Sequence, residues 1–399
     1  MIRSLPDEGV DYLVGGPSLS ARPRPPFDSL ACEFTGALSK LLRGRAATNA
    51  YTDLATFAFW CREANVKRLK QAYDDGQVRL GRGLAFHIAP SNVPVNFAFS
   101  LVMGLLAGNA NVVRVPSALA PQAVTLIDAI RDVLSEDRFD ELAKETAIVS
   151  YPRGRAITAG FSALADARVI WGGDATVNEI RALPAASRCM DLCFGDRYSL
   201  CVLNAESVLN LPDEEMNRLV RNFFNDTYVL DQNACSSPQV VIWTGDNPDA
   251  AGDRFWPAVK QYVGGAYELE AGQAVDKLVA TMSSIISVNE VTRIVSDGID
   301  VVRLNLNALP AELETARGRY GMFFEYTAGT LEDIVDAIRP KFQTMTYFGF
   351  TKDELASFVL DKRLVGFDRL VPVGRALEMD LVWDGNDIVR HLSRVISIL

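Results

Sequence analysis

The chain has 399 residues, of which 49% are apolar and 23% are charged, and its net charge is −10. This length allows two domains of usual size, each with its own core. The acidic balance argues against nucleic acid or an anionic membrane as the main partner, because proteins that bind them present a basic face. The first residues lack the apolar core of a signal peptide, and no run of about 18 apolar residues occurs. We therefore expect no membrane span and a cytoplasmic location.

Cysteine and histidine usage argues against disulfides and metal sites. The six cysteines show no disulfide-framework spacing, so we expect reduced thiols. Cys189 and Cys193 stand four residues apart rather than in a CxxC pair, which disfavours a zinc or redox motif. Because His87 and His391 are the only histidines, we predict no metal centre, and a histidine-dependent catalytic triad has few candidates.

The apolar pattern of the first half changes near residue 80. The first thirty residues are rich in Pro, Gly, Ser and Arg and predict an extended, loosely packed arm. Residues 29–75 have helical apolar spacing. Short apolar runs then alternate with amphipathic runs, which predicts strands that are each followed by a helix. The expected strands are 83–92, 111–117, 146–152 and 167–174, and the expected helices are 95–108, 121–136, 158–167 and 175–183.

The same alternation restarts after residue 198. Expected strands are 237–245, 301–306, 321–328 and 344–350, and expected helices are 214–228, 254–265 and 331–339. A turn at 384–386 and a final amphipathic helix end the chain. Alternating strands and helices favour an α/β fold with a Rossmann-type, doubly wound parallel sheet, followed by a second α/β domain. We place the domains at 1–198 and 199–365, with 366–399 as a C-terminal segment that packs back on the core or serves in oligomerisation.

The turn after the first expected strand, Pro90-Ser91-Asn92, allows two interpretations. Ser91 or Asn92 could cap the following helix, since a side-chain oxygen there accepts from free backbone N–H groups. Alternatively, Asn92 lies at the C-terminal edge of the sheet, where ligands bind in such folds. Its side-chain amide could then donate to an oxyanion.

Two further turns carry residues suited to a nucleotide. Arg114 ends a valine-rich strand, and Ser117 opens the next loop. Arg114 either reaches solvent or donates to ribose hydroxyls or a phosphate. In WGGD, Gly172 and Gly173 allow close backbone approach before a helix N-terminus, which favours a phosphate, with Asp174 beside them. The spacing is not GxGxxG, and an ordinary strand-to-helix turn would also use glycine.

Cys235 stands in DQNACSSPQ, between an expected helix and an expected strand. A lone cysteine is more often a buried small residue than a nucleophile. Here small neighbours leave space for an incoming carbonyl, and the following strand would support the loop. Reactivity would also require stabilisation of the thiolate form.

Taken in order, these segments resemble the aldehyde dehydrogenase superfamily, and within it the LuxC-type acyl-CoA reductases, the fatty acid reductase component of bacterial luminescence systems. The phrases that carry the resemblance are HIAPSNVPVNF, GNANVVRVPS, VIWGGDATVNEIR, FGDRYS, DQNACSSPQ, KFQTMTYFG, DRLVPVG and VWDG, spread over residues 80 to 390. The resemblance implies an aldehyde dehydrogenase-like fold, with a nicotinamide-cofactor domain and a catalytic domain that supplies the cysteine nucleophile.

The resemblance also implies roles for individual residues. Cys235 would take the acyl group, and Asn92 with the backbone N–H of Cys235 would form the oxyanion hole. Arg114 stands where the superfamily commonly has a lysine near the adenosine ribose. Gly173 and Asp174 would line the cofactor pyrophosphate turn, and Glu325 resembles the glutamate that holds the nicotinamide ribose. The full set of implied cofactor residues is Arg114, Ser117, Gly172, Gly173, Asp174 and Glu325.

One departure from the family pattern bears on the reaction. Hydrolysing aldehyde dehydrogenases carry a general-base glutamate where this chain has Phe194, counting back from Ser199. Phenylalanine cannot activate water, so the reduction of an acyl-CoA to the aldehyde is favoured. Asp196 lies two residues further on, so a shifted alignment stays open. A hydrolysing aldehyde dehydrogenase and a non-catalytic acyl-binding subunit are the alternatives.

Cofactor and partner expectations follow from the resemblance. NADPH is preferred, with NADH as the second choice, because Arg114 suits an additional phosphate. The acyl group would come from acyl-CoA or from an acyl-protein synthetase or acyltransferase partner. A homo-oligomer, dimer or tetramer, is expected, with no metal, no nucleic acid and no membrane span.

Overall fold

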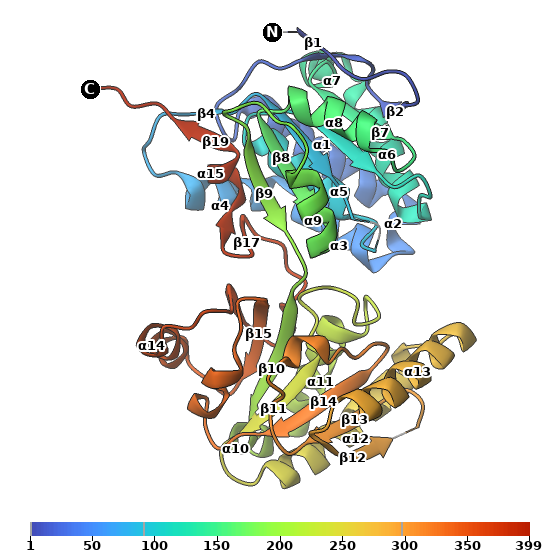
Figure 1. Ribbon diagram of the computed structural model, residues 1–399, viewed down its shortest axis with the longest axis vertical. Coiled ribbons are helices and arrows are strands. Elements are labelled where there is room, and N and C mark those ends of the chain that lie inside the picture. The colour runs from blue at the N-terminus through green and yellow to red at the C-terminus, as the bar shows by residue number, and fades with distance from the viewer. Residues whose placement is uncertain (1, 91, 297) are drawn as a thin grey trace. The chain divides into compact units, whose positions relative to one another are not determined.

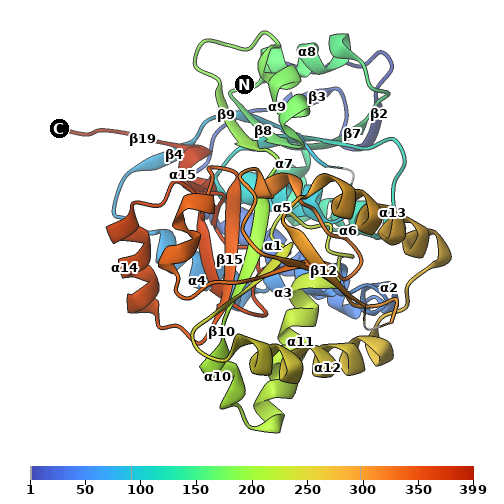
Figure 2. The same ribbon diagram turned by 60° about the horizontal axis from the view of Figure 1, so that its bottom comes forward.

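The computed structural model describes residues 2–90, 92–296 and 298–399, and across them the chain forms two compact units. The first unit contains Met1–Asp196 and Met379–Leu399, and the second contains Arg197–Glu378. Figures 1 and 2 show that each unit is built on its own twisted sheet. The chain therefore leaves the first unit once and returns to it for its last residues.

The sheet of the first unit is parallel except at one edge. Its strand order is β2-β7-β6-β5-β8-β9, with β2 antiparallel to β7. The strands are β2 (Asp11–Val14), β5 (Leu84–Ile88), β6 (Ala110–Val115), β7 (Thr146–Ser150), β8 (Ala167–Trp171) and β9 (Met190–Phe194). The chain runs outward from β5 to β7 and then continues on the other side of β5 as β8. This confirms the doubly wound sheet and places its topological switch between β5 and β8.

Helices cover both faces of this sheet. On one face lie α1 (Ser29–Gly44), α3 (Thr52–Trp60), α4 (Glu63–Tyr73), α5 (Asn96–Leu106) and α6 (Pro121–Leu134). On the other lie α8 (Arg155–Leu164) and α9 (Asp174–Arg181). Four short helices complete the set for the described part of this unit, and they are α2 (Ala46–Asn49), η1 (Asp137–Phe139), α7 (Asp140–Ala143) and α15 (Ile388–His391).

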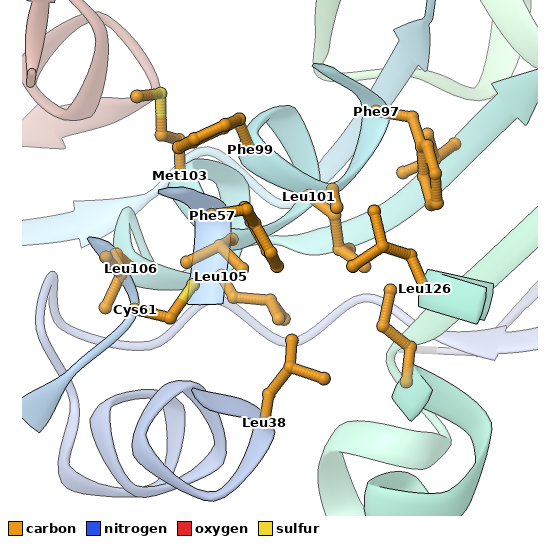
Figure 3. Close-up of a cluster of buried hydrophobic side chains, with 14 of the residues drawn as sticks. Leu38, Phe57, Cys61, Phe97, Phe99, Leu101, Met103, Leu105, Leu106 and Leu126 are labelled. Atoms are coloured by element: carbon orange, nitrogen blue, oxygen red, sulfur yellow. The ribbon is translucent and has the colours of Figure 1, made fainter. Parts of the chain in front are cut away.

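The central helix of the first core is α5. Every residue from Phe97 to Leu106 is buried, as expected for a helix that is apolar on all sides. Figure 3 shows α5 side chains such as Leu101 and Leu105 meeting Leu38 of α1 and Phe57 of α3. The helices that precede the sheet in sequence therefore form a second layer over α5.

The N-terminal residues are not the loosely packed arm that their composition predicts. β1 (Ile2–Ser4) pairs with β3 (Ser18–Ser20), and β2 extends the main sheet. Leu19 and Phe27 are buried. Backbone pairing and burial of a few apolar residues here outweigh the disordering tendency of Pro and Gly.

The last residues return to the first unit. A hairpin of β17 (Val382–Trp383) and β18 (Asn386–Asp387) has Asp384 and Gly385 at positive φ, which confirms the expected turn. The final helix is much shorter than the amphipathic sequence pattern predicts, since α15 covers only Ile388–His391. The chain continues as β19 (Ser393–Val395), paired with β4 (Arg79–Gly81), because that pairing satisfies its backbone groups.

The second unit is a second, mostly parallel sheet. Its order is β12-β13-β14-β11-β10-β15-β16, with only β12 antiparallel to its neighbour among the described strands. The strands are β10 (Tyr198–Asn204), β11 (Val240–Thr244), β12 (Val291–Ser296), β13 (Val302–Leu306), β14 (Met322–Thr327), β15 (Phe342–Phe348) and β16 (Arg369–Pro372). The second α/β fold expected from the sequence is therefore present.

Two helical layers enclose the second sheet. α10 (Ala205–Leu209), α11 (Asp213–Thr227) and α12 (Pro248–Ala266) pack on one face. α13 (Ala271–Ser287) and α14 (Lys352–Lys362) pack on the other, with the short turns η2 (Leu313–Thr315) and η3 (Glu332–Ala337). Residues 331–339, expected as an α-helix, form the tighter η3 turn.

Candidate active site

A cleft opens at the C-terminal edge of the first sheet. It has a volume of about 570 Å³ and is lined by residues that follow β5, β6, β7 and β8. The register explains this convergence, because Ile88 pairs with Arg114 on one side and with Ile170 on the other. The sequence-predicted residues that line it are Asn92, Arg114, Ser117, Gly172 and Gly173. The cleft thus occupies the switch point, where doubly wound sheets bind ligands.

Arg114 and Ser117 meet at one backbone carbonyl. Arg114 Nη2 and Ser117 Oγ donate to the oxygen of Tyr151 at 3.5 Å and 3.3 Å. The Arg114 guanidinium also lies 5.3 Å from the centre of the Tyr151 ring. Tyr151 is buried, and burial raises the pKa of its phenol. Contacts with Tyr151 therefore position the Arg114 side chain, and its remaining N–H donors can turn toward a ligand in the cleft.

The glycine turn is held by two aspartates. The N–H of Asp174 donates to Asp196 Oδ2 at 3.1 Å, and the N–H of Asp196 donates to Asp174 Oδ1 at 3.0 Å. Asp174 opens α9, and Gly173 is its N-cap residue. A Cβ on Gly173 would lie 3.2 Å from the Asp196 carboxylate oxygens. Gly173 therefore borders the cleft, while the carboxylate of Asp174 is directed to the loop at Asp196.

A buried hydrogen-bonded chain lies beneath the cleft. Trp171 Nε1 donates to Ser100 Oγ at 2.9 Å, and Ser100 Oγ lies 2.7 Å from His87 Nδ1. His87 Nε2 lies 2.9 Å from Asn111 Oδ1. Because Asn111 Oδ1 can only accept, Nε2 must carry the proton, and Ser100 then donates to Nδ1. Burial lowers the pKa of His87 to about 4, so the ring stays neutral and these hydrogen bonds are kept.

Phe194 closes the floor next to this chain. Its ring stacks on Trp171 with centroids 3.8 Å apart and planes 14° from parallel. Both side chains are buried. The Phe194 ring therefore packs behind Trp171. In the resemblance to hydrolysing enzymes, this position would carry the general-base glutamate.

Asn92 does not cap α5. The N-cap residue of that helix is Val95, and no side chain caps it. Asn92 is exposed and lines the cleft, so of its two sequence interpretations the capping one is wrong. Ser91, the other capping candidate, lies outside the described residues.

Cys235 lies at the N-terminal edge of the second sheet, in the loop between α11 and β11. Gln343 Nε2, at the start of β15, donates to Cys235 Sγ at 3.4 Å. Ser199 Oγ, in β10, donates to the carbonyl of Cys235 at 2.7 Å and accepts from the N–H of Thr344 at 3.2 Å. The thiol is half-buried. Two neighbouring strands thus fix both its sulfur and its backbone.

The rest of the cysteine loop is held by glutamine side chains. Gln232 Nε2 donates to the carbonyls of Pro238 and Met322, and its Oε1 accepts from Gly321. Gln239 Nε2 donates to the carbonyl of Gln232. Gln232 and Asp231 both adopt positive φ, a conformation unusual for residues with a Cβ. Buried hydrogen bonds therefore hold this loop in a conformation that it would rarely adopt alone.

Glu325 lies inside the second unit and not in the cleft. Its Oε1 accepts from Trp243 Nε1 at 2.8 Å and from Trp256 Nε1 at 2.6 Å. Its Oε2 accepts from Arg303 at 3.0 Å and from Asn305 at 2.8 Å. The carboxylate is buried. These four donors stabilise its charge and join β11, β13, β14 and α12.

Gln343 is one of the residues that the sequence did not single out, as are Arg153 and Arg155 of the cleft. Gln343 belongs to KFQTMTYFG, one of the motifs that carry the family resemblance, but a glutamine in a predicted strand gives no sign of its partner. The contact depends on the register that sets β15 beside β10.

Comparisons with known proteins show which sequences and folds this chain resembles. Residues 65–252 match the family model described as acyl-CoA reductase (LuxC). The match covers slightly less than half of the chain, which is thus similar to the LuxC family over these residues. The chain is also similar to the long-chain acyl-protein thioester reductase of Aliivibrio fischeri, with 24% identity over 169 residues, 42% of this chain and 33% of that protein. The corresponding Vibrio harveyi protein is 27% identical over 168 residues, 41% of this chain and 33% of that protein.

Solved structures show the same fold. Aldehyde dehydrogenase 21 from Physcomitrella patens, in complex with succinate, aligns with a TM-score of 0.63 and 11% identity, over 92% of this chain and 85% of that one. Lactaldehyde dehydrogenase from Escherichia coli aligns with a TM-score of 0.60 and 13% identity, over 88% and 79%. The aldehyde dehydrogenase-like fold is thereby confirmed. The matched region of the chain spans only about a third of the length of these curated relatives.

None of the helices formed by the described residues is both long and apolar enough to cross a membrane.

Proposed function

We propose that this protein reduces a long-chain acyl thioester to the aldehyde, using a nicotinamide cofactor and an acyl-enzyme intermediate on Cys235. The observation that carries the proposal is the setting of Cys235, a half-buried thiol whose sulfur accepts from Gln343 and whose backbone is tied to Ser199. Cys235 lies within the residues that match the acyl-CoA reductase family, as do Asn92 and Arg114. The named relatives are reductases of long-chain acyl-protein thioesters.

The cleft residues fit a nicotinamide dinucleotide. Three arginines line it, Arg114, Arg153 and Arg155, against the single carboxylate of Glu179 among the described lining residues. Arg153 and Arg155 are exposed at the start of α8. Guanidinium groups bind phosphates well, and three of them favour NADPH over NADH. The bound cofactor would supply the hydride.

In the proposed first half-reaction, Cys235 sulfur attacks the acyl carbonyl and the thiol carrier leaves with a proton. The Gln343 N–H would stabilise negative charge on sulfur, since hydrogen bonds to charged acceptors are stronger than those to neutral ones. Asn92, with the backbone N–H of Cys235, would hold the oxyanion, each donor contributing roughly 3 kcal/mol. In the second half-reaction, hydride adds to the acyl carbon, the C–S bond breaks and the sulfur regains a proton.

Exclusion of water distinguishes this reaction from aldehyde oxidation to the acid. The stacked Phe194 and Trp171 rings offer no group that could activate water. Asp196, the alternative general base, accepts from the N–H of Asp174. A thioester protected from hydrolysis is available for reduction, so we prefer the reductase over the hydrolysing enzyme.

Further parts of the proposal concern location, partners and assembly. Either CoA or a protein could carry the acyl group, with an acyl-protein synthetase or acyltransferase as the partner that supplies it. We propose a cytoplasmic homo-oligomer, a dimer or tetramer. The six cysteines are free thiols, the form that a reducing compartment maintains. Asp174 and Glu325 stay proposed cofactor residues.

The test is a single-turnover experiment with tetradecanoyl-CoA. Without cofactor, intact-protein mass should rise by one acyl group located on Cys235, and addition of NADPH should release tetradecanal and restore the original mass. Cys235→Ser should lose aldehyde formation by at least about a thousandfold while binding NADPH normally. Release of tetradecanoic acid instead would support the hydrolysing enzyme, and absence of any acylation would favour a non-catalytic subunit.

A further inference from the structure

A groove on the first unit has a charge opposite to that of the whole chain. It runs between α1 and α4 and has a volume of about 830 Å³. Two carboxylates, Glu33 and Glu63, line it against six cations. The cations are Lys40, Arg43, Arg62, Lys67, Lys70 and Arg138. The whole chain, by contrast, has a net charge of −10. We call this surface the basic groove.

Folding gathers these cations from separate parts of the sequence. Lys40 and Arg43 lie one turn apart on α1, and Lys67 and Lys70 lie one turn apart on α4. Arg138 comes from η1, more than sixty residues later. A reading of the sequence alone finds the basic residues scattered, because this cluster depends on the packing of α1 against α4.

Three of the six cations already have partners. The guanidinium of Arg62 lies 3.1 Å from the centre of the Phe59 ring, Arg138 pairs with Glu136 at 2.6 Å, and Lys70 Nζ donates to the carbonyl of Phe27 at 3.1 Å.

The other three cations are open to a ligand. Lys40, Arg43 and Lys67 are exposed, and no hydrogen bond or ion pair among the described residues involves their side chains. The groove thus holds uncompensated positive charge along both of its helices.

The lining of the groove includes small and apolar residues. Gly36 and Ala37 of α1 and Ala64 and Val66 of α4 are among the residues that line it. A Cβ on Gly36 would lie 4.0 Å from Glu63 Cβ, so the two helices approach each other here. The helices α1 and α4, with 16 and 11 residues, are about 24 Å and 16 Å long at 1.5 Å per residue. A groove bordered by two helices, with small and apolar residues beside charged ones in its lining, matches the way proteins bind an amphipathic helix.

We propose that the basic groove is the docking surface for an acidic helix of the protein that delivers the acyl group. This inference rests on the proposed function, and the acyl-protein substrates named for the relatives supply the reason to expect a protein carrier. Exposed lysines with flexible stems suit contacts with the carboxylates of a helix. At physiological salt, charges more than about 8 Å away are screened, so the local cations outweigh the acidic remainder of the surface.

Two other anionic partners fit less well. A nucleic acid would extend beyond the groove onto the acidic surface of the chain, where its phosphates would be repelled. Free CoA would call for fixed donors that converge on its phosphates, whereas Lys40, Arg43 and Lys67 are exposed side chains on two separate helices.

The experiment compares two substrates that carry the same acyl group. One is tetradecanoyl-CoA, and the other is an acidic, helical acyl carrier protein loaded with tetradecanoate. The groove variant is Lys40→Glu/Arg43→Glu/Lys67→Glu. The control variant, Arg221→Glu/Lys260→Glu/Lys352→Glu, makes the same charge change at exposed cations of the second unit. A neutral variant, Lys40→Gln/Arg43→Gln/Lys67→Gln, guards against misfolding of the first, and thermal unfolding is measured for all.

The expected result is a selective change in KM. In the groove variant, KM for the carrier protein should rise about tenfold and lose most of its dependence on salt, while KM for tetradecanoyl-CoA stays within about twofold of the wild type. The control variant should behave as the wild type, and the neutral variant should fall between. An equal rise for both substrates, a rise for CoA alone, or no change would overturn the proposal.

Failure of the proposed function gives a different result. If the wild type reduces neither substrate, calorimetric titration with the unloaded carrier protein decides the docking surface by itself. Binding that is lost in the groove variant and kept in the control variant supports the inference. Equal binding by all variants, or none by the wild type, overturns it.

Discussion

Gln343 contacts the thiol of Cys235 in the second unit. It is buried at the start of β15 and donates to Cys235 Sγ at 3.4 Å. A neutral amide can stabilise negative sulfur without adding a proton-transfer group of its own. Gln343 is therefore suited to hold the sulfur in the proposed acyl transfer without itself taking or giving a proton.

Replacement of Gln343 should change the reactivity of Cys235 and leave cofactor binding intact. A hydrogen bond to a charged group contributes about 1.5–3 kcal/mol, so Gln343→Ala should slow alkylation of Cys235 by iodoacetamide roughly tenfold or more near neutral pH and move its pH profile to higher pH. Gln343→Glu should slow it further, because a carboxylate beside the sulfur opposes its negative charge.

The matched control is Asn233→Ala, an exposed position in the same loop. Its alkylation profile should equal that of the wild type. If Gln343→Ala gives the wild-type profile too, the contact has only a structural role.

Single residues also show where sequence reasoning reached its limit. Asn92, Arg114, Gly172 and Gly173 were predicted as cleft residues because each lies at or just after the end of a parallel strand, and strand ends gather at one edge. Glu325 lies within a strand, and the sequence does not tell which partners its side chain meets. Trp243 and Trp256 donate to it from β11 and α12, contacts that depend on how helix and sheet pack. Its contact with a nicotinamide ribose stays a prediction.

At the scale of elements, His87 connects β5, α5, β6 and β8 beneath the cleft. Its ring bonds Ser100 of α5 and Asn111 of β6, and Ser100 in turn accepts from Trp171 of β8. All of these polar groups are buried. Protonation of the ring would leave a buried charge and would turn Nδ1 from an acceptor into a donor.

Acidification should therefore loosen this part of the first sheet. The folded pKa of about 4 lies below the ordinary value of 6.5, so the stabilisation is complete above pH 6.5 and is lost as the pH falls toward 4. The linkage amounts to about 3 kcal/mol at most. Amide hydrogen exchange in β5 and β8, measured between pH 7 and 4.5 and corrected for the intrinsic rate, should show protection falling across this window.

The variant His87→Gln removes the titrating group and should flatten this pH dependence, although its protection at pH 7 will be lower. His391→Gln, at the only other histidine and on the surface, should keep the wild-type slope. An identical slope in the wild type and His87→Gln would assign the effect to carboxylates elsewhere.

The parallel strands of the first sheet were predictable, whereas the errors lie at the ends of the chain and in the second unit, where α13, α14 and β12 were not predicted. Strands such as β5 and β8 are short apolar runs that are buried on both faces, and this pattern is local. The last residues have a helical pattern, yet β19 forms because β4, three hundred residues earlier, offers an edge to pair with. The N-terminal strands depend on the edge of β7 in the same way. Local patterns cannot report partners so distant in sequence.

At the scale of the whole molecule, α13 presents an unusual surface. Lys277, Thr281 and Ser284 face inward and are buried, and Lys277 Nζ donates to the carbonyls of Ile299, Asp300 and Tyr320. The outward face carries exposed aliphatic side chains instead. They are Val275, Leu278, Val279, Met282 and Ile286. Contiguous apolar surface of this kind is common at subunit interfaces.

The proposed homo-oligomer should therefore depend on α13. Burial of this face between two copies would remove apolar area from water at about 25 cal/mol per Å², and two charges placed there would oppose burial. We expect Leu278→Glu/Met282→Glu to sediment as a monomer at micromolar concentration where the wild type is a dimer or tetramer. Leu360→Glu/Val365→Glu, at exposed aliphatic positions near α14, should keep the wild-type assembly. A monomeric wild type would remove the oligomer from the proposal, and an oligomer that survives the α13 variant would place the interface elsewhere.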